Sequence, residues 1–299
     1  MTAVAAISFS GLTKLYGHLT AVSDLTFDVA EGEILGFLGL NGAGKTTSIR
    51  ILLDLLRPTS GHASIFGHDC QSDGLAAREQ VGYLPAELGL YNDMTGRDVL
   101  RLFARLSPRS VDPHYVGELQ ERLALPDADV RRKLREYSSG MKRKLGIIQA
   151  LQSDPPLLIL DEPTEGLDPL MQDAFYALLT DLQRRGRTIF FSSHVLSEVE
   201  RVCQRVALVR RGELVLLSTV EETRKLAPRD VRVTFSADVP APLASSQLLR
   251  SEPRMWHLKV HGPLGPLLQD LASLPVADIE VTEAKLEDAV RDYYRGDAA

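Results

Sequence analysis

Short apolar runs alternate with amphipathic stretches along most of the chain. Residues 5–30 alternate apolar and polar positions, which predicts antiparallel strands joined by turns. The segments 33–38, 156–163 and 187–194 each contain a compact apolar run (ILGFL, LLIL and IFF), as in buried strands. A helical spacing of apolar positions follows the first of these runs, at 46–56. Strands that alternate with helices predict an α/β fold, in which helices cover a mostly parallel sheet.

Two other regions add to this alternation. Residues 92–152 repeat apolar positions every three or four residues, which predicts a helical subdomain. The composition shifts at 223–230, where we expect a linker, and the patterns beyond it predict strand, strand, helix, strand and helix. The last of these helices would cover 285–294. We therefore expect a main domain at 1–222 and a small α+β domain at 223–299.

Composition narrows the functional classes. The chain has 299 residues, 44% hydrophobic and 25% charged, as in ordinary globular proteins. A net charge of −6 argues against a strongly basic nucleic-acid-binding protein. Cys70 and Cys203 show neither a disulfide pattern nor metal-ligand spacing, which indicates a reducing compartment. The N-terminus lacks a signal-peptide pattern and no run of about 18 apolar residues occurs, so we expect a cytosolic chain without a membrane span.

The segment GLNGAGKT lies between a predicted strand and a predicted helix and fits the pattern G-x-x-x-x-G-K-[ST]. Glycines let the backbone fold around phosphate oxygens, and the following amides converge on the phosphates at a helix N-terminus. Lys45 adds a positive charge, and Thr46 offers a hydroxyl to Mg²⁺. The alternative is a glycine-rich turn that binds nothing. The expected nucleotide-binding residues are Gly39, Leu40, Asn41, Gly42, Ala43, Gly44, Lys45, Thr46 and Thr47.

Two carboxylates and a histidine end the other two buried runs. Asp161 and Glu162 close LLILDEP, at the edge where open α/β sheets bind ligands. Neighbouring side chains on an extended segment point in different directions, so we expect Asp161 to hold Mg²⁺ and Glu162 to polarise an attacking water. His194 ends TIFFSSH and could bond the γ-phosphate or that water. The alternatives are a pair of acids that cap the next helix and a structural or surface histidine.

The stretch YSSGMKRK combines hydroxyls, a glycine and three cations. Ser138, Ser139 and Gly140 suit a helix start, because short hydroxyls accept bonds from free first-turn amides. The cations at 142–144 follow at the helix end where the macrodipole disfavours positive charge. Such a place would attract an anion.

Together these motifs resemble the nucleotide-binding subunit of an ATP-binding cassette (ABC) transporter. The match covers roughly residues 5–220 and follows the order of that family: Tyr16, GLNGAGKTT, YSSGMKRK, LLILDEP, EGLD and His194. Several unrelated classes share the phosphate loop, whereas the serine-glycine signature just before the Asp-Glu strand belongs to this family. The resemblance implies a P-loop NTPase core of the ABC-ATPase type, with antiparallel β and helical subdomains, that binds ATP and Mg²⁺.

The same resemblance implies that the signature faces the γ-phosphate of an ATP held by a second subunit. The signature residues are Ser138, Ser139, Gly140 and Met141. One P-loop and one signature per chain then imply a head-to-tail homodimer, or a pair with a related subunit, with two ATP molecules at the seam. Asp168 would cross that seam, and Tyr16 would stack on adenine unless it is a buried core tyrosine. The cations at 142–144 either touch the anion or lie in part on a solvated face.

The chain departs from the family pattern within two of these motifs. Ser139 stands where the family often has glycine, Met141 replaces a usual glutamine, and Leu40 replaces a frequent proline. The changes at Ser139 and Met141 keep the helix start and its hydroxyl, and Leu40 changes only a side chain on the outside of the phosphate loop, so we expect all three to be tolerated.

A third departure concerns the metal. In the segment VGYLPAELGLY, the family usually has a Mg²⁺-binding glutamine directly after the strand. The matching position here is Ala86, which has no ligand atom. Glu87 is an alternative ligand; otherwise metal binding rests on Thr46 and Asp161. This departure affects the expected coupling to a membrane subunit more than the ATP site.

The resemblance implies an ATP-hydrolysing subunit that powers an exporter whose membrane part, the permease, is a separate chain. The C-terminal part, with KLEDAVRDYY near its end, resembles the tail of ATPase subunits from bacterial drug, antibiotic and polysaccharide or lipid exporters. Such a subunit is cytoplasmic, lies on the inner face of the cell membrane through its permease, and binds no nucleic acid. The alternatives are a soluble cassette ATPase that acts on ribosomes or DNA, and a degenerate module that binds ATP without hydrolysing it.

Overall fold

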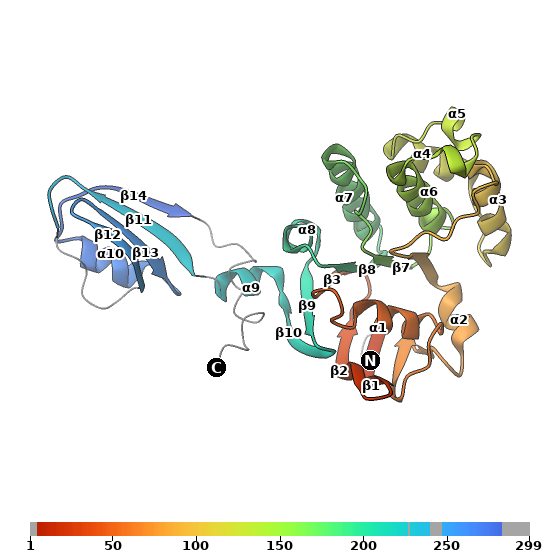
Figure 1. Ribbon diagram of the computed structural model, residues 1–299, viewed down its shortest axis with the longest axis horizontal. Helices are drawn as coiled ribbons and strands as arrows, with labels where there is room; N and C mark the ends of the chain where they lie inside the picture. The colour runs from red at the N-terminus through yellow and green to blue at the C-terminus, as the bar shows by residue number, and fades with distance from the viewer. Residues whose placement is uncertain (1–4, 227, 240–246, 283–299) are drawn as a thin grey trace. The chain divides into compact units, whose positions relative to one another are not determined.

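The chain divides into two compact units. The computed structural model describes residues 5–226, 228–239 and 247–282 (Figure 1). The two units cover residues 1–217 and 218–299, and each is described by itself.

A six-stranded sheet forms the centre of the N-terminal unit, in the order β10-β9-β3-β8-β7-β6. Its strands are β3 (Ile34–Leu38), β6 (Val81–Leu84), β7 (Leu157–Asp161), β8 (Thr188–Ser193), β9 (Arg205–Arg210) and β10 (Glu213–Thr219). The neighbouring strands β9, β3, β8, β7 and β6 pair in parallel, which confirms the mostly parallel sheet expected from the apolar runs. Every residue of β3, β7 and β8 is buried, as expected for strands that are covered on both faces.

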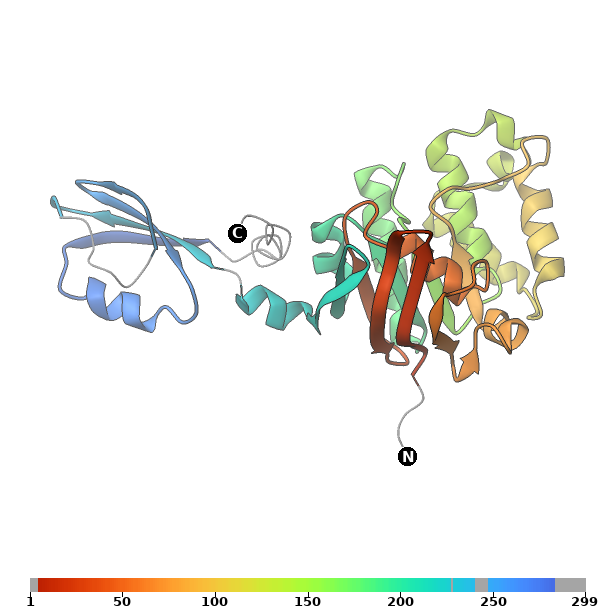
Figure 2. The same ribbon diagram turned by 60° about the horizontal axis from the view of Figure 1, so that its bottom comes forward.

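A second, antiparallel sheet has the order β2-β1-β4-β5, and Figure 2 shows its two long strands β1 and β2 side by side. Its strands are β1 (Ile7–Tyr16), β2 (Leu19–Val29), β4 (Ser60–Ile65) and β5 (His68–Asp69). A hydrophobic core joins this sheet to the central sheet and to α1 (Lys45–Leu52). Phe9, Phe27, Phe37 and Phe190 pack there in tilted ring contacts. This core therefore anchors both ends of the loop between β3 and α1.

Helices lie on both sides of the central sheet. Figure 1 shows α1 on one side and α7 and α8 on the other. The remaining helices of this unit are α2 (Gly74–Glu79), α3 (Gly96–Leu106), α4 (Pro113–Arg122), α5 (Asp127–Val130), α6 (Ser139–Leu151), α7 (Pro169–Arg184) and α8 (Leu196–Val202), with a 3₁₀ turn at Leu134–Glu136. Helices α3 to α6 fall within the helical region expected at 92–152. Within the described ranges no helix is long and apolar enough to cross a bilayer.

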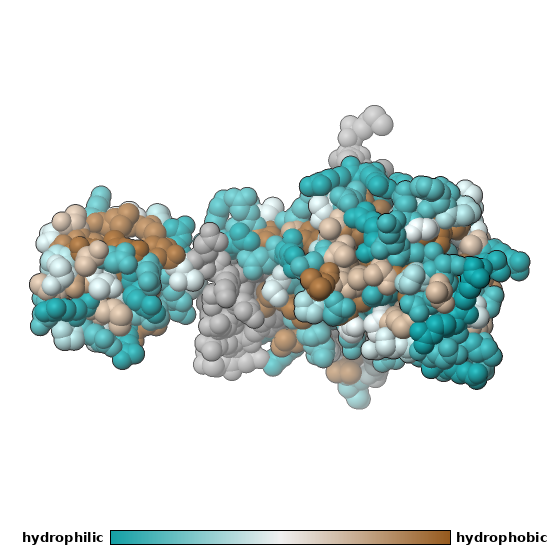
Figure 3. All heavy atoms as spheres, turned by 90° about the horizontal axis from the view of Figure 1, so that it is seen from above, coloured by the Kyte–Doolittle hydropathy of each residue, from teal (hydrophilic) through white to brown (hydrophobic). Residues whose placement is uncertain are grey.

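The C-terminal unit is a small α+β structure. Its antiparallel sheet has the order β12-β13-β11-β14. Its elements are α9 (Val220–Leu226), β11 (Arg229–Phe235), β12 (Gln247–Glu252), β13 (Met255–Val260), α10 (Gly265–Leu271) and β14 (Val276–Thr282). Alternate residues of β11 and β13, including Val233 and Trp256, form its core with Leu267 and Leu271 of α10. Figure 3 shows apolar residues gathered on one side of this unit.

Two expectations for this region are corrected. The stretch 223–230, expected as a linker, holds the end of α9 and the start of β11. Strand β12 was not predicted, because three of its six residues, in QLLRSE, are charged or serine and the apolar alternation is weak. The helix expected at 285–294 lies outside the described residues, and the domain boundary expected after residue 222 stays a prediction.

Candidate functional site

The P-loop, the two carboxylates and the histidine meet at one edge of the central sheet. β3, β8 and β7 are neighbouring parallel strands, so their carboxyl ends lie side by side. The P-loop, residues 39–46, follows β3; Asp161 is the last residue of β7, and His194 follows β8. The candidate site therefore lies where open α/β sheets place their ligands.

The P-loop surrounds a cavity of about 270 Å³ at the start of α1. Gly44 caps this helix with a φ of 103°, and a Cβ there would lie 2.5 Å from the carbonyl oxygen of Ala21. Among the described residues no side chain caps α1, so its first-turn amides are available to a ligand. The cavity is lined by Ala21, Leu40, Asn41, Gly42, Ala43, Gly44, Lys45, Thr46, Thr47, Ala86 and Glu162. Ala21 was not predicted, because it lies on β2 and carries no functional group.

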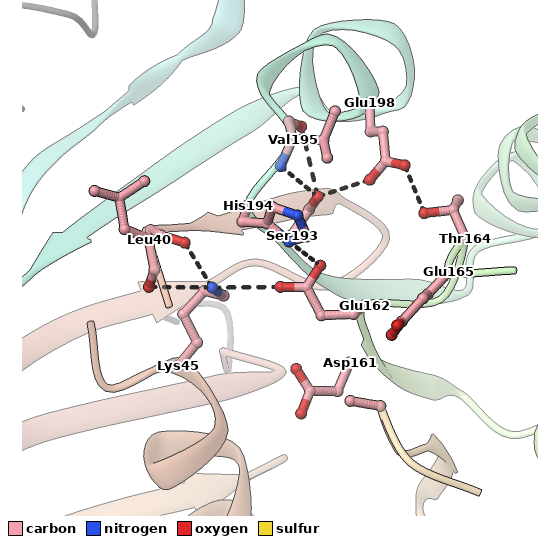
Figure 4. Close-up of polar contacts among 12 residues, drawn as sticks. Leu40, Lys45, Asp161, Glu162, Thr164, Glu165, Ser193, His194, Val195 and Glu198 are labelled. Atoms are coloured by element: carbon pink, nitrogen blue, oxygen red, sulfur yellow. Dashed lines mark hydrogen bonds and ion pairs between the residues drawn. The ribbon is translucent and has the colours of Figure 1, made fainter. Parts of the chain in front are cut away.

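Lys45 is buried beside this cavity, with 6% of its side chain exposed. Its Nζ donates to the carbonyl of Gly39 at 2.5 Å and lies 3.3 Å from Oε1 of Glu162 (Figure 4). The ammonium thus lies between the loop backbone and the carboxylate that follows β7. A phosphate bound by the loop would receive a charge-assisted hydrogen bond from this position.

Glu162 and His194 are in direct contact. Nδ1 of His194 lies 2.7 Å from Oε2 of Glu162 (Figure 4). Glu162 adopts a φ of 48°, and its amide donates to the carbonyl of Ser192 at 3.1 Å. This left-handed conformation costs a residue with a side chain about 1 kcal/mol or more, and it persists where surrounding structure imposes it. His194 lies on the expected edge of the sheet, whereas its contact with Glu162 was not predicted, and the catalytic roles of both residues stay predictions.

Asp161 and Thr46 form the part of the site that fits a metal. Asp161 is 1% exposed, and Thr46 Oγ1 donates to its Oδ2 at 3.1 Å. Its Oδ1 is buried without a hydrogen-bond partner among the described residues, since the nearby Ser192 hydroxyl does not reach bonding geometry. Burial raises the pKa of Asp161, and the hydrogen bond from the Thr46 hydroxyl lowers it in part. An unpartnered carboxylate oxygen beside a threonine hydroxyl is a suitable ligand set for Mg²⁺.

Two alternatives from the sequence are wrong. Asp161 and Glu162 do not cap the next helix, because Asp168 caps α7 and accepts a bond from the amide of Met171 at 3.0 Å. Tyr16 is not a buried core residue, because it is 47% exposed at the end of β1. Stacking of Tyr16 on adenine and the seam role of Asp168 stay predictions.

The signature segment forms the start of α6, as expected. The Ser138 side chain accepts a hydrogen bond from the amide of Met141 at 3.2 Å, which caps the helix. A Cβ at Gly140 would lie 2.9 Å from the carbonyl oxygen of Gly166, so glycine permits close packing against the segment after the carboxylates. Within the described ranges, none of the signature residues lines the P-loop cavity. Their expected contact with a second subunit's ATP stays a prediction.

Arg143, in the second turn of α6, is buried, with 6% of its side chain exposed. Its guanidinium donates to the carbonyls of Glu165 at 3.2 Å, Pro85 at 2.9 Å and Ala86 at 2.7 Å. Burial lowers its pKa. A solvated face therefore does not describe Arg143, although the flanking lysines are partly exposed. Arg143 connects the signature helix to the two loops beside the cavity. No sequence pattern could have predicted this role, because its partners are backbone carbonyls.

Ala86 and Glu87 differ in their relation to the cavity. Ala86 lines it, whereas Glu87 is exposed and does not belong to its lining. The metal-binding role considered for Glu87 stays a prediction without support from this geometry. Thr46 and Asp161 remain the ligands that the structure places together.

Comparisons with known proteins agree with this geometry. A family model described as ABC transporter matches residues 22–165. An uncharacterized ABC transporter ATP-binding protein of Nostoc sp. is 40% identical over 68% of this chain and 61% of its own length. A Nod factor export ATP-binding protein of Burkholderia orbicola is 40% identical over 71% of this chain and 70% of its own length. A solved structure of the ATP-binding subunit of an ABC transporter has a TM-score of 0.68 at 30% identity, over 74% of this chain and 92% of that one.

The fold and the site define a P-loop cassette of the kind found in the ATP-binding subunits of ABC transporters. The chain belongs to the ABC transporter family, among its ATP-binding proteins. The match to the Nostoc relative spans less than two thirds of that protein, 61% of its length.

Proposed function

We propose that this chain binds and hydrolyses ATP to power export through a separate membrane subunit. The observation that carries the proposal is the contact of Glu162 with both Lys45 and His194 beside the P-loop cavity. The name of the Burkholderia relative, a Nod factor export ATP-binding protein, supports export. Names that describe ATP-binding proteins also support a membrane part on another chain.

The chemistry follows from the positions of these side chains. The first-turn amides of α1 and the Lys45 ammonium hold the β- and γ-phosphates of ATP. Glu162 orients and polarises the attacking water, and His194 keeps the Glu162 carboxylate facing the γ-phosphate. When bound, Mg²⁺ neutralises charge on the phosphates, and Thr46 and Asp161 are the residues that would hold it.

The working form is a head-to-tail pair of chains. The first turn of α6 offers hydroxyls and amides, yet the signature residues do not line the cavity of their own chain within the described ranges. A second copy turned by a two-fold axis would place its signature over this cavity and complete the site. ATP binding then closes the pair, and closure moves the membrane subunit on the inner face of the membrane.

The Glu162→Gln variant tests this function. We expect its kcat for ATP hydrolysis to fall by about 10²- to 10⁴-fold, because the water loses its general base, while ATP still binds. Light scattering after size exclusion should show a dimer only with Mg-ATP. Glu213→Gln, an exposed change on β10, is the control and should keep the wild-type rate.

Hydrolysis that survives Glu162→Gln would contradict the proposal. If the Glu162→Gln protein binds ATP but stays monomeric, the proposed ATPase activity stands and the proposed head-to-tail pair is contradicted.

A further inference from the structure

Glu198 is a buried carboxylate behind the catalytic pair that the proposed chemistry leaves unused. It lies on α8, 8% exposed, and accepts two short hydrogen bonds from hydroxyls. Thr164 Oγ1 donates to its Oε1 at 2.5 Å, and Ser193 Oγ donates to its Oε2 at 2.6 Å. Figure 4 shows these bonds on the side of Glu162 and His194 away from Asp161. A buried carboxylate is unfavourable unless it is hydrogen-bonded, and here each of the two Glu198 oxygens accepts a hydrogen bond.

The two hydroxyls belong to the segments that carry the catalytic pair. Thr164 lies two residues after Glu162, and Ser193 directly precedes His194. Glu198 therefore connects the end of β7 to the end of β8 at the point where the two side chains extend towards the cavity. The bond between His194 Nδ1 and Glu162 Oε2, at 2.7 Å, depends on the spacing of these two segments.

Both hydrogen bonds run from a hydroxyl to the Glu198 carboxylate. A carboxylate accepts only, so both hydroxyls must donate towards it. The Ser193 oxygen then has its lone pairs free, and it accepts from the amide of Val195 at 2.9 Å. This second bond fixes the backbone on the far side of His194, so the residue is held from both sides.

Glu162 needs such support from outside its own backbone. Its left-handed conformation, with a φ of 48°, is unfavourable and persists only when neighbouring structure imposes it. One restraint is the hydrogen bond from the Glu162 amide to the Ser192 carbonyl. Another is the hydrogen bond from Thr164, two residues later, to Glu198. Tyr176 of α7 is buried near Glu198: burial raises its pKa, and the Glu198 carboxylate raises it further.

We propose that Glu198 is a positioning residue for ATP hydrolysis. It holds the segments of Glu162 and His194 at a fixed separation, so that His194 keeps the Glu162 carboxylate aimed at the attacking water. The inference rests on the proposed function and adds a residue to it. Glu198 touches no part of the P-loop cavity lining, so its effect passes through Thr164 and Ser193.

Steady-state ATP hydrolysis by the full chain tests this inference. We expect Glu198→Gln to lower kcat by about tenfold to 100-fold, the scale of a small misplacement of catalytic groups. The KM for Mg-ATP should stay within about twofold, since the P-loop is untouched. Thr164→Val removes one of the two hydroxyls with little change of shape and should lower kcat in the same way. Ser197→Ala, an exposed change on the same helix, is the matched control and should keep the wild-type rate.

A second background separates positioning from general support of the fold. In His194→Ala protein the pair is already broken, so adding Glu198→Gln should lower kcat by no more than about twofold further. A further tenfold to 100-fold loss of kcat when Glu198→Gln is added to His194→Ala would overturn the inference. So would a Glu198→Gln protein whose KM and thermal midpoint change along with its kcat. Thr164→Val serves the same comparison if Glu198→Gln fails to fold.

The outcomes distinguish this inference from the proposed function. If the wild-type protein hydrolyses ATP and both Glu198→Gln and Thr164→Val keep the wild-type kcat, the role of Glu198 is contradicted and the proposed function stands. Wild-type protein that binds ATP without hydrolysing it contradicts the proposed function itself.

Discussion

The start of α1 and the start of α6 offer the same kind of anion site, yet they are built in opposite ways. At α1 no described side chain occupies the first-turn amides, and the buried Lys45 ammonium stands beside them. At α6 the Ser138 side chain already accepts a hydrogen bond from the amide of Met141, and Arg143, one turn further on, donates to backbone carbonyls of other segments. The first site is open to a ligand within one chain. The second is capped by a side chain of its own chain, and under the proposed function its ligand comes from a second chain.

The difference teaches how one chain can hold two halves of one reaction. The P-loop half places Lys45 and Glu162 in the lining of one cavity of about 270 Å³. The signature half contributes shape and hydroxyls, and it is fixed to loops of its own chain through Arg143 and Gly140. Changes in the first half should therefore act on ATP binding, and changes in the second on assembly and hydrolysis.

Lys45→Met should produce the largest effect of this comparison. We expect both ATP affinity and hydrolysis to fall by about 100-fold, because a charge-assisted contact to phosphate is lost. Calorimetry on the isolated protein measures the affinity. Lys133→Met, an exposed change remote from the cavity lining, is the control, and wild-type ATP affinity in Lys45→Met would remove the P-loop half from the account.

Gly140→Ala should leave ATP affinity within about twofold and lower hydrolysis by about tenfold or more. Its new Cβ would lie 2.9 Å from the carbonyl of Gly166, so the signature turn must shift. Gly117→Ala, in α4 with open space around it, is the matched control and should even stabilise the helix by about 1 kcal/mol. Weaker ATP binding by monomeric Gly140→Ala would erase the difference between the two halves.

How much the sequence predicts also differs between the halves. Glycine spacing and three apolar runs are local patterns, so the P-loop and the edge with Asp161, Glu162 and His194 could be expected. The partners of Arg143 and Glu198 come from segments far apart in the chain, and backbone carbonyls or single hydroxyls leave no pattern. No sequence pattern predicts the left-handed backbone conformation of Glu162 either, since glutamate rarely adopts it.

Folding stability should change in opposite directions at the two halves. Burial raises the pKa of Asp161, so its ionised form weakens the folded state at neutral pH. Asp161→Asn should therefore raise the free energy of unfolding by about 1 kcal/mol at pH 7, as replacements at strained functional sites often do. Ser138→Ala should lower it by about 1 kcal/mol through loss of the helix cap.

The pH dependence gives the sign of the Asp161 effect. A raised pKa means that stability from this carboxyl is present at low pH and is lost as pH rises through that pKa. The advantage of Asp161→Asn should hence shrink on acidification, where the wild-type carboxyl is neutral too. Urea unfolding at several pH values measures it, and an advantage that grows towards acid pH would refute the burial argument.

Tyr16→Ala should show the smallest effect. Its ring is exposed at the end of β1, beside the Lys14 ammonium, and the loss of a stacking contact with adenine is worth about 0.5–1.5 kcal/mol. We therefore expect a roughly two- to tenfold weaker ATP affinity by calorimetry, with triphosphate alone bound as before. Tyr91→Ala, another exposed tyrosine, is the control. Equal losses for ATP and triphosphate would place Tyr16 outside the adenine site.

The most direct test mixes the two defective halves. Lys45→Met and Gly140→Ala proteins are assayed for ATP hydrolysis separately and then together, at equal concentrations and saturating Mg-ATP. In a head-to-tail pair, half of the dimers would be mixed, and each mixed dimer would hold one site with an intact P-loop and an intact signature. The account predicts recovery of about a quarter of the wild-type activity. A mixture no more active than the sum of its parts would contradict a site shared between two chains.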